Sequence, residues 1–138
     1  MEIGYSKRAG STPAFELLAE GWNEIVQSGF TPEHDGVSPV LASNEVLYTY
    51  NAEGELLGCL AWSSDIAAGE AKVTLAYVEV TSRKTGIFKA LWVAFKQRLQ
   101  KDDIERITLQ VGVENKVMQA VLRHVECVPV SFTYDMQL

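Results

Sequence analysis

The sequence lacks any long hydrophobic run, has only two cysteines and carries more acidic than basic residues. No stretch of about 20 apolar residues is present, which argues against a membrane-spanning helix. The first residues, MEIGYSKRAG, lack the apolar core of a signal peptide. Cys59 and Cys127 lie in apolar segments and form no Cys-x-x-Cys pair, as is typical of reduced thiols in the cytosol. We therefore expect a cytoplasmic protein with no membrane partner.

The net charge of −6 argues against nucleic-acid binding as well. Nucleic-acid-binding domains cluster Lys and Arg against phosphates, whereas this chain has 12 basic and 18 acidic residues. The enzyme motifs GxGxxG, GxxxxGKS/T, HExxH and GxSxG are all absent. His34, Asp35, His124 and Cys127 have neither the number nor the spacing of a zinc site. We expect no nucleic-acid partner and no metal.

Helical and strand patterns alternate along the chain. With 138 residues, 47% of them hydrophobic, the chain can bury the core of a single domain over residues 1–138. Helical periodicity begins at Pro13, at Ile87 and after Asn115. Strand patterns cover 2–8, 45–50, 55–63, 71–80, 106–113 and VSFTYDMQ near the end. The three middle strands form an antiparallel meander, and the helix between 71–80 and 106–113 makes those two strands parallel. This order predicts an α/β fold with a mixed, mostly antiparallel central sheet flanked by helices.

The segment YVEVTSRKTGIFKALW, residues 77–92, carries the strongest functional signal. A β-branched strand enters a short basic turn with one glycine, and that turn opens directly into an amphipathic helix. The first N–H groups of a helix lack intrahelical partners and can bind an anion. Arg83 and Lys84 add positive charge, and Gly86 lets the backbone approach closely. The alternative is an ordinary solvated turn, but the order of strand, turn and helix favours a phosphate site.

This turn resembles the acetyl-CoA signature of the GCN5-related N-acetyltransferase family, which is Arg or Gln, two residues, Gly, one residue, then Gly or Ala. Here it reads Arg83-Lys84-Thr85-Gly86-Ile87-Phe88. A second segment, LQVGVENKVMQAVL, places Asn115 where the family has an asparagine between strand and helix. The resemblance covers about residues 45–138 well and the N-terminal helices loosely. It implies the acyl-CoA N-acyltransferase fold with acetyl-CoA as co-substrate.

The resemblance also implies a cofactor site. The strand before the turn would bind the pantetheine arm through its backbone, and the strand after the helix would splay away to make room. The N–H near Val80 would polarise the thioester carbonyl. The implied cofactor-binding residues are Val78, Val80, Arg83, Lys84, Thr85, Gly86, Ile87, Phe88 and Asn115.

The chain departs from the family pattern in places that matter for catalysis. Phe88 replaces a small residue of the signature. Many members have a tyrosine seven residues after the asparagine, which is thought to protonate the leaving thiolate, and here that position is Leu122. The Gly-Phe that usually follows the helix is Glu126-Cys127. His124 or Cys127 could replace the missing acid, although a partly buried histidine and an inert cysteine are the favoured interpretations.

Three residues are candidates for acid–base chemistry. Glu79 lies on the strand expected to hold the cofactor, and a carboxylate there could deprotonate the attacking amine, directly or through water. The alternative for Glu79 is an outward-facing strand residue in a salt bridge. Tyr77 shares the face of Glu79 and could orient substrate or act as an acid, with core packing as the alternative. Tyr134, on the final predicted strand, is another candidate acid or a structural residue.

The resemblance implies transfer of an acetyl group to a primary amine by direct attack in a ternary complex. The acceptor would be a small molecule or a peptide that the sequence does not identify. One alternative is a catalytically silent module that keeps the fold and binds CoA or a protein partner, as the loss of the tyrosine at Leu122 suggests. Another is a fold relative that binds no cofactor. The final strand would expose an edge, which allows a homodimer.

Overall fold

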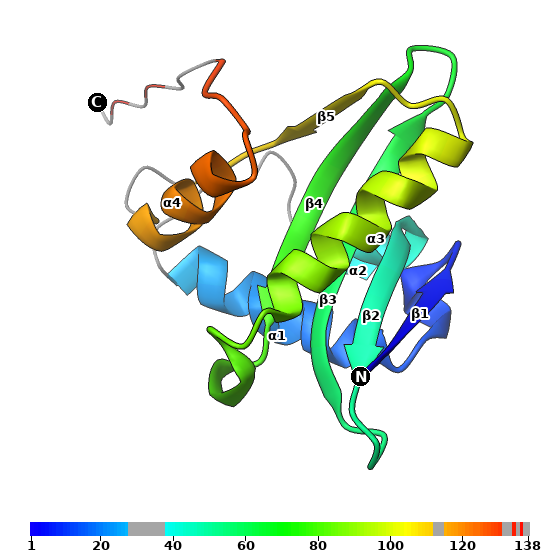
Figure 1. Cartoon of the computed structure of the whole chain (residues 1–138), viewed down its shortest axis with the longest axis vertical. Coiled ribbons are helices and arrows are strands. Elements are labelled where there is room, and N and C mark those ends of the chain that lie inside the picture. Colours follow the sequence, from blue (N-terminus) through cyan, green and yellow to red (C-terminus); the bar gives the residue numbers. More distant parts are fainter. Residues whose placement is uncertain (28–37, 112–114, 131–133, 135, 137–138) are drawn as a thin grey trace.

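The computed structural model describes residues 1–27, 38–111, 115–130, 134 and 136, and its centre is one five-stranded sheet (Figure 1). The strands are β1 (Glu2–Ser6), β2 (Glu45–Tyr50), β3 (Leu56–Asp65), β4 (Glu70–Val78) and β5 (Arg106–Leu109). The helices are α1 (Ala14–Gln27), α2 (Ser38–Ser43), α3 (Ile87–Lys101) and α4 (Lys116–His124), with 3-10 turns η1 (Ala9–Ser11) and η2 (Val80–Ser82). This order matches the predicted one except for the additional short helix α2 and for the C-terminal strand.

The strands lie side by side in the order β1-β2-β3-β4-β5. The pairs β1–β2, β2–β3 and β3–β4 are antiparallel, and the pair β4–β5 is parallel. This confirms the predicted meander and the parallel crossover through α3. A mixed, mostly antiparallel sheet flanked by helices is therefore the fold of the chain.

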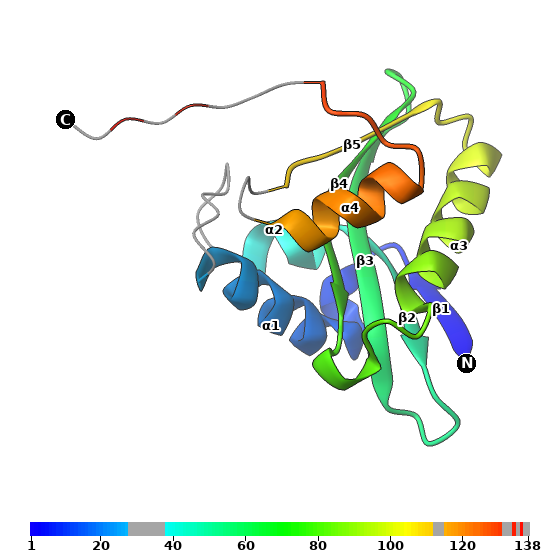
Figure 2. The same cartoon turned by 60° about the vertical axis from the view of Figure 1, so that its left-hand side comes forward.

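Helices cover both faces of the sheet and divide the core into two layers (Figure 2). On one face, Leu18 and Trp22 of α1 pack with Val46 and Leu75 of the sheet. On the other face, Leu91 and Phe95 of α3 pack against the sheet, as the helical periodicity predicts. Because each helix has one apolar stripe, each can cover only one face of the sheet.

Aromatic side chains fill the layer under α3. Trp62 is fully buried, with its ring centre 4.8 Å from that of Phe95. Arg98 of α3 reaches β1, where its guanidinium carbon lies 3.1 Å from the ring centre of Tyr5. Stacking of this cation on the ring draws the residue partly under the surface.

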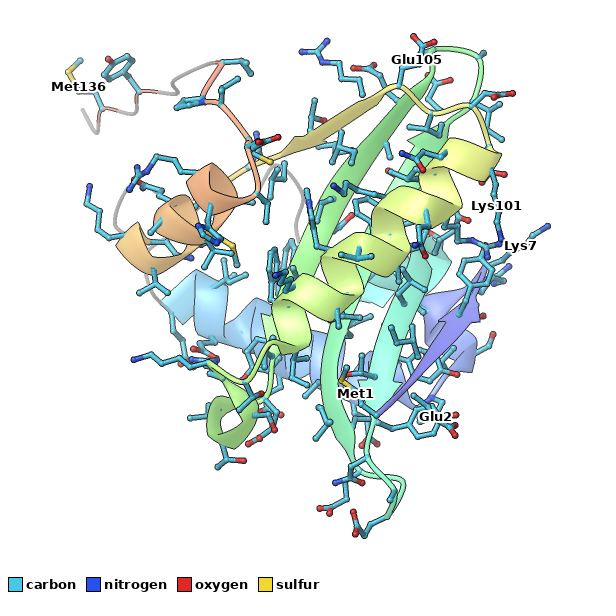
Figure 3. All side chains as sticks on the ribbon, in the orientation of Figure 1. Met1, Glu2, Lys7, Lys101, Glu105 and Met136 are labelled. Carbon is cyan, nitrogen blue, oxygen red and sulfur yellow. The ribbon has the colours of Figure 1, made fainter. Side chains whose placement is uncertain are left out.

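The predicted C-terminal strand is not found in the described part of the tail. Val128–Val130 have no strand conformation, and residues 131–133, 135 and 137–138 lie outside the described residues. Val128, Val130, Tyr134 and Met136 are 74–91% exposed. Met136 lies far from the sheet in Figure 3. No helix in the described part of the chain has the length and hydrophobicity needed to cross a bilayer.

Candidate active site

The edge of β4 that faces β5 is free of a strand partner over its second half. Residues 70–73 of β4 pair with 106–109 of β5, and within the described residues the pairing ends there. The two strands diverge beyond this point (Figure 1). The N–H of Glu79 donates to the carbonyl of Leu57 on β3 at 2.8 Å, so Val78 before it presents its backbone to the opposite, open side. This is the splay that the resemblance implies.

The turn before α3 has the backbone expected of an anion site. Gly86 has φ of +86° and immediately precedes Ile87, the first residue of α3. No side chain caps this end of the helix in the described structure. A Cβ at Gly86 would meet no atom within 4 Å, so the backbone angle, and not crowding, is what favours glycine here. The first N–H groups of α3 therefore have no intrahelical partner and, among the described residues, no side-chain cap.

The side chains of the first two residues of α3 pack into the core. Ile87 is 7% exposed and packs under the helix. Phe88, the bulky departure from the family signature, stacks on Trp92 with ring centres 5.7 Å apart and planes at 18°. The side chain of Phe88 therefore packs along the helix. Its backbone N–H stays in the first turn of α3, among the groups that lack an intrahelical partner.

Strand β4 ends two residues earlier than predicted. Val80 does not extend the strand but begins η2, and its side chain is 58% exposed. The cause is Glu79, whose carboxylate accepts hydrogen bonds from the N–H of Thr81 at 3.0 Å, from the Thr81 hydroxyl and from Ser82 Oγ at 3.2 Å. The predicted strand over 71–80 is therefore wrong at its end, because the carboxylate folds the chain into a turn.

The hydrogen bonds to Glu79 also bear on its chemistry. Those from Thr81, the stronger influence, and from Ser82 stabilise the carboxylate and lower the pKa of Glu79. A carboxylate with a lowered pKa is a weaker base. The contacts therefore favour a structural role for Glu79, as the cap of η2, over proton abstraction.

Tyr77 is buried between β4 and α1. It is 6% exposed, and its hydroxyl donates to Glu20 Oε1 at 3.2 Å. The close packing needs Gly21, because a Cβ there would lie 2.6 Å from Cγ of Tyr77. Burial, and then the carboxylates of Glu24 and Glu20, raise the pKa of Tyr77. Its phenol therefore keeps its proton at neutral pH. The burial of Tyr77 agrees with core packing, the alternative to an acid–base role.

Arg83 makes contacts that the sequence does not predict. Its Nη2 lies 2.9 and 3.1 Å from the two carboxylate oxygens of Glu24 on α1, and its Nε donates to the carbonyl of Val78 at 2.9 Å. Its guanidinium also lies over the ring of Tyr77, 5.3 Å from the ring centre. The hydrogen bond to Arg83 is the main cause that lowers the pKa of Glu24.

The sequence does contain a signal for this contact. Glu16, Glu20 and Glu24 follow one another at four-residue spacing, so like charges share one stripe of α1. Such repulsion is relieved when a cation from elsewhere in the fold lies against the stripe. Only the tertiary structure identifies that cation as Arg83.

The remaining candidates are dispersed. Asn115 caps α4, because its side-chain oxygen accepts from the N–H of Met118 at 3.1 Å. Leu122 is 8% exposed and apolar, so it supplies no proton. Tyr134 is 91% exposed. Burial raises the pKa of the Cys127 thiol, so that thiol resists ionisation. His124 is exposed at the end of α4.

No group of three His, Cys, Asp or Glu side chains in the described ranges is arranged to hold a metal ion.

The turn before α3 and the open edge of β4 lie next to each other in the chain. The predicted cofactor-binding residues of this turn and of the start of α3 are Arg83, Lys84, Thr85, Gly86, Ile87 and Phe88. Thr85 belongs to this turn, where its hydroxyl donates to the carbonyl of Ser82. Lys84 has φ of +64° and is exposed in the same turn. Within the described residues, this region therefore combines an unpaired strand edge with a helix N-terminus that no side chain caps.

Replacing Glu79 separates its two roles. For the acetyl transfer that the resemblance implies, we expect Glu79→Gln to keep kcat within about threefold of wild type. The amide oxygen of glutamine can still accept the hydrogen bonds from Thr81. A true general base contributes roughly 10²–10⁴-fold. Glu79→Ala, which removes the cap, is the comparison variant. A loss of 100-fold or more in Glu79→Gln, together with the disappearance of one limb of the pH–rate profile, would instead assign Glu79 the proton.

Comparisons with known proteins agree at the level of fold. No family model and no curated protein matches the sequence. Among solved structures, a ribosomal-protein-alanine N-acetyltransferase from Brucella melitensis aligns over 100% of both chains with a TM-score of 0.70 and 15% identity. An aminoglycoside acetyltransferase from an uncultured soil metagenomic sample aligns over 100% of this chain and 99% of its own, with a TM-score of 0.68 and 18% identity.

A mutant of the BH1408 protein from Bacillus halodurans has a higher TM-score, 0.76, over 100% of this chain and 99% of its own at 14% identity. At such identities the likeness is one of fold. The predicted resemblance is confirmed at that level: the chain has the fold of the GCN5-related N-acetyltransferases.

Proposed function

We propose that this protein is an acetyl-CoA-dependent N-acetyltransferase that moves an acetyl group to a primary amine. The observation that carries the proposal is the divergence of β4 and β5 beside an uncapped helix N-terminus. An acyl-CoA ligand has a long amide-containing arm and a pyrophosphate. The open strand edge suits the arm, and the turn at Gly86 suits the pyrophosphate.

Each part of the ligand would have its own protein groups. The N–H groups of Ile87 and Phe88, with the charge of Lys84, would hold the pyrophosphate, and Thr85 would shape the turn. The N–H of Val78 would face the pantetheine arm, since the Val78 carbonyl already accepts from Arg83. The N–H of Val80 is the candidate for polarising the thioester carbonyl. Asn115, at the start of α4, would approach the ligand from the β5 side.

The reaction would proceed in a ternary complex. The amine nitrogen attacks the thioester carbonyl, the new C–N bond forms and the C–S bond breaks. The amine loses a proton, and the CoA thiolate takes one up. Solvent is the proposed partner for both transfers, because Glu79 is engaged in hydrogen bonds and Leu122 occupies the place of the usual acid. Tyr77 and Tyr134 remain candidate acids that substitution to Phe would test.

The rival proposal is a silent module that binds CoA or a protein partner without turnover. Leu122 in place of the tyrosine favours it. The two proposals differ in one measurement: free thiol released from acetyl-CoA in the presence of a panel of amines supports the enzyme. Tight binding of acetyl-CoA without thiol release supports the module.

The first experiment is thermal unfolding with and without acetyl-CoA, with ATP as a phosphate control. Ligand at 100 times its Kd adds about 2.7 kcal/mol to the free energy of unfolding. For a chain of this length that corresponds to a rise in Tm on the order of 5–10 °C. A rise with acetyl-CoA and not with ATP is the expected result. No rise in a cooperatively folding sample would contradict the proposal and favour a fold relative that binds no cofactor.

The acceptor is proposed only by class, as a small-molecule or peptide amine. The solved structures with this fold include enzymes named for a ribosomal-protein alanine and for aminoglycosides, which are acceptors of both kinds.

We further propose that residues 1–138 act as one domain in the cytoplasm. A homodimer also remains a prediction, and the exposed apolar residues Val128, Val130, Tyr134 and Met136 are its candidate contacts.

A further inference from the structure

We propose that Arg83 is a positioning residue that ties the cofactor turn to α1 through Glu24, and that its guanidinium is not a phosphate ligand. This inference rests on the proposed function, because it concerns affinity for acetyl-CoA. It changes the role that the family signature implies for Arg83 and adds Glu24, which lies 59 residues earlier in the chain.

The contacts of Arg83 within the described residues engage its Nε, its Nη2 and the face of its guanidinium. Nη2 bridges both oxygens of Glu24, Nε is held by the carbonyl of Val78, and the guanidinium covers the ring of Tyr77. The three contacts join Arg83 to β4 and α1. Because a guanidinium is a rigid planar fork, turning Nε or Nη2 to a phosphate beyond the N-terminus of α3 would break these contacts.

These contacts link the parts of the fold that must be held together for cofactor binding. Val78 is the last residue of β4, Glu24 lies in the last turns of α1, and Arg83 begins the turn that ends at Gly86. Strand, helix and turn are therefore tied at one guanidinium. A turn held in this way presents its N–H groups in a fixed arrangement, which reduces the ordering cost of binding an anion.

The arrangement can be tested by a double-mutant cycle on acetyl-CoA affinity. Glu24→Gln and Arg83→Gln each remove one charge of the pair and keep a similar shape. We expect each to raise the Kd for acetyl-CoA by about three- to fivefold, the scale of an exposed ion pair. The Kd of the double variant for acetyl-CoA should not exceed the higher Kd of the two single variants, because both changes break the same contact.

The chain offers a matched control. Glu70 and Arg106 form another exposed ion pair, with Nη1 3.3 Å from Oε1, at the opposite end of β4. Glu70→Gln makes the same chemical change and should leave the Kd unchanged. Amide hydrogen exchange in the ligand-free protein adds a readout independent of acetyl-CoA, and residues 83–88 should exchange faster in both Glu24→Gln and Arg83→Gln.

Opposite effects of the two variants would overturn the proposal. If Glu24 merely holds Arg83 away from phosphate, Glu24→Gln will lower the Kd while Arg83→Gln raises it. Additive losses in the double variant, or unchanged Kd in both singles, would also reject the tie. If wild-type protein does not bind acetyl-CoA, the proposed function fails. Unchanged amide exchange in that case rejects the tie itself, so the two failures are distinguishable.

Discussion

Gly86→Val is expected to raise the Kd for acetyl-CoA by roughly 30-fold or more, which corresponds to about 2 kcal/mol. Gly86 has φ of +86°, and a left-handed backbone costs an L-residue about 1–2 kcal/mol. Valine is branched at Cβ, so it tolerates this region poorly. The variant relieves the strain by rotating the turn out of the geometry that directs the first N–H groups of α3 at the ligand. The side chain would also occupy the space into which the proposed phosphates would bind.

Gly54→Val is a matched control for this substitution. Gly54 has φ of +80° in the turn between β2 and β3, and a Cβ there also meets nothing within 4 Å. Both variants should therefore lose similar stability in the ligand-free protein. Only Gly86→Val should lose affinity, as measured by calorimetric titration with acetyl-CoA. Equal Kd values for the two variants would show that the turn at Gly86 does not contact the ligand.

The parts of the fold with strong periodicity could be predicted from the sequence. Helix α3 places Leu91, Trp92, Phe95 and Leu99 on one stripe, and all four are buried. Strand β2 begins and ends at the predicted residues, and the crossover from β4 to β5 is parallel as predicted. These features follow from local spacing and chain connectivity, so a single sequence contains the information for them.

Features set by contacts between side chains could not be predicted in the same way. Val78, Glu79 and Val80 continue a strand pattern, and only the hydrogen bonds from Thr81 and Ser82 to Glu79 show why β4 ends at Val78. The pairing of Arg83 with a helix far away in the sequence is a tertiary contact. Periodicity does not identify the partner of such a residue, and the family signature pointed to a different one.

Lys84→Glu is expected to weaken acetyl-CoA binding about tenfold at low salt. Lys84 lies in the turn between Arg83 and Gly86, is exposed and makes no ion pair with any residue in the described ranges. Unlike Arg83, it is therefore available to attract the pyrophosphate. Lys and Glu tolerate the φ of +64° at this position about equally, so the substitution changes charge and leaves backbone strain nearly constant.

The salt dependence of Lys84→Glu distinguishes charge from folding. Lys101→Glu is the control, because it makes the same change of charge at Lys101, the last residue of α3. A helix of this length spans about 20 Å from the turn to its end. Charges separated by more than about 8 Å are largely screened at physiological ionic strength, so Lys101→Glu should bind acetyl-CoA like wild type. The tenfold deficit of Lys84→Glu should shrink as salt increases, because its cause is a nearby exposed charge. A deficit that is independent of salt, or shared by Lys101→Glu, would show that Lys84 acts through the fold and that the phosphates bind elsewhere.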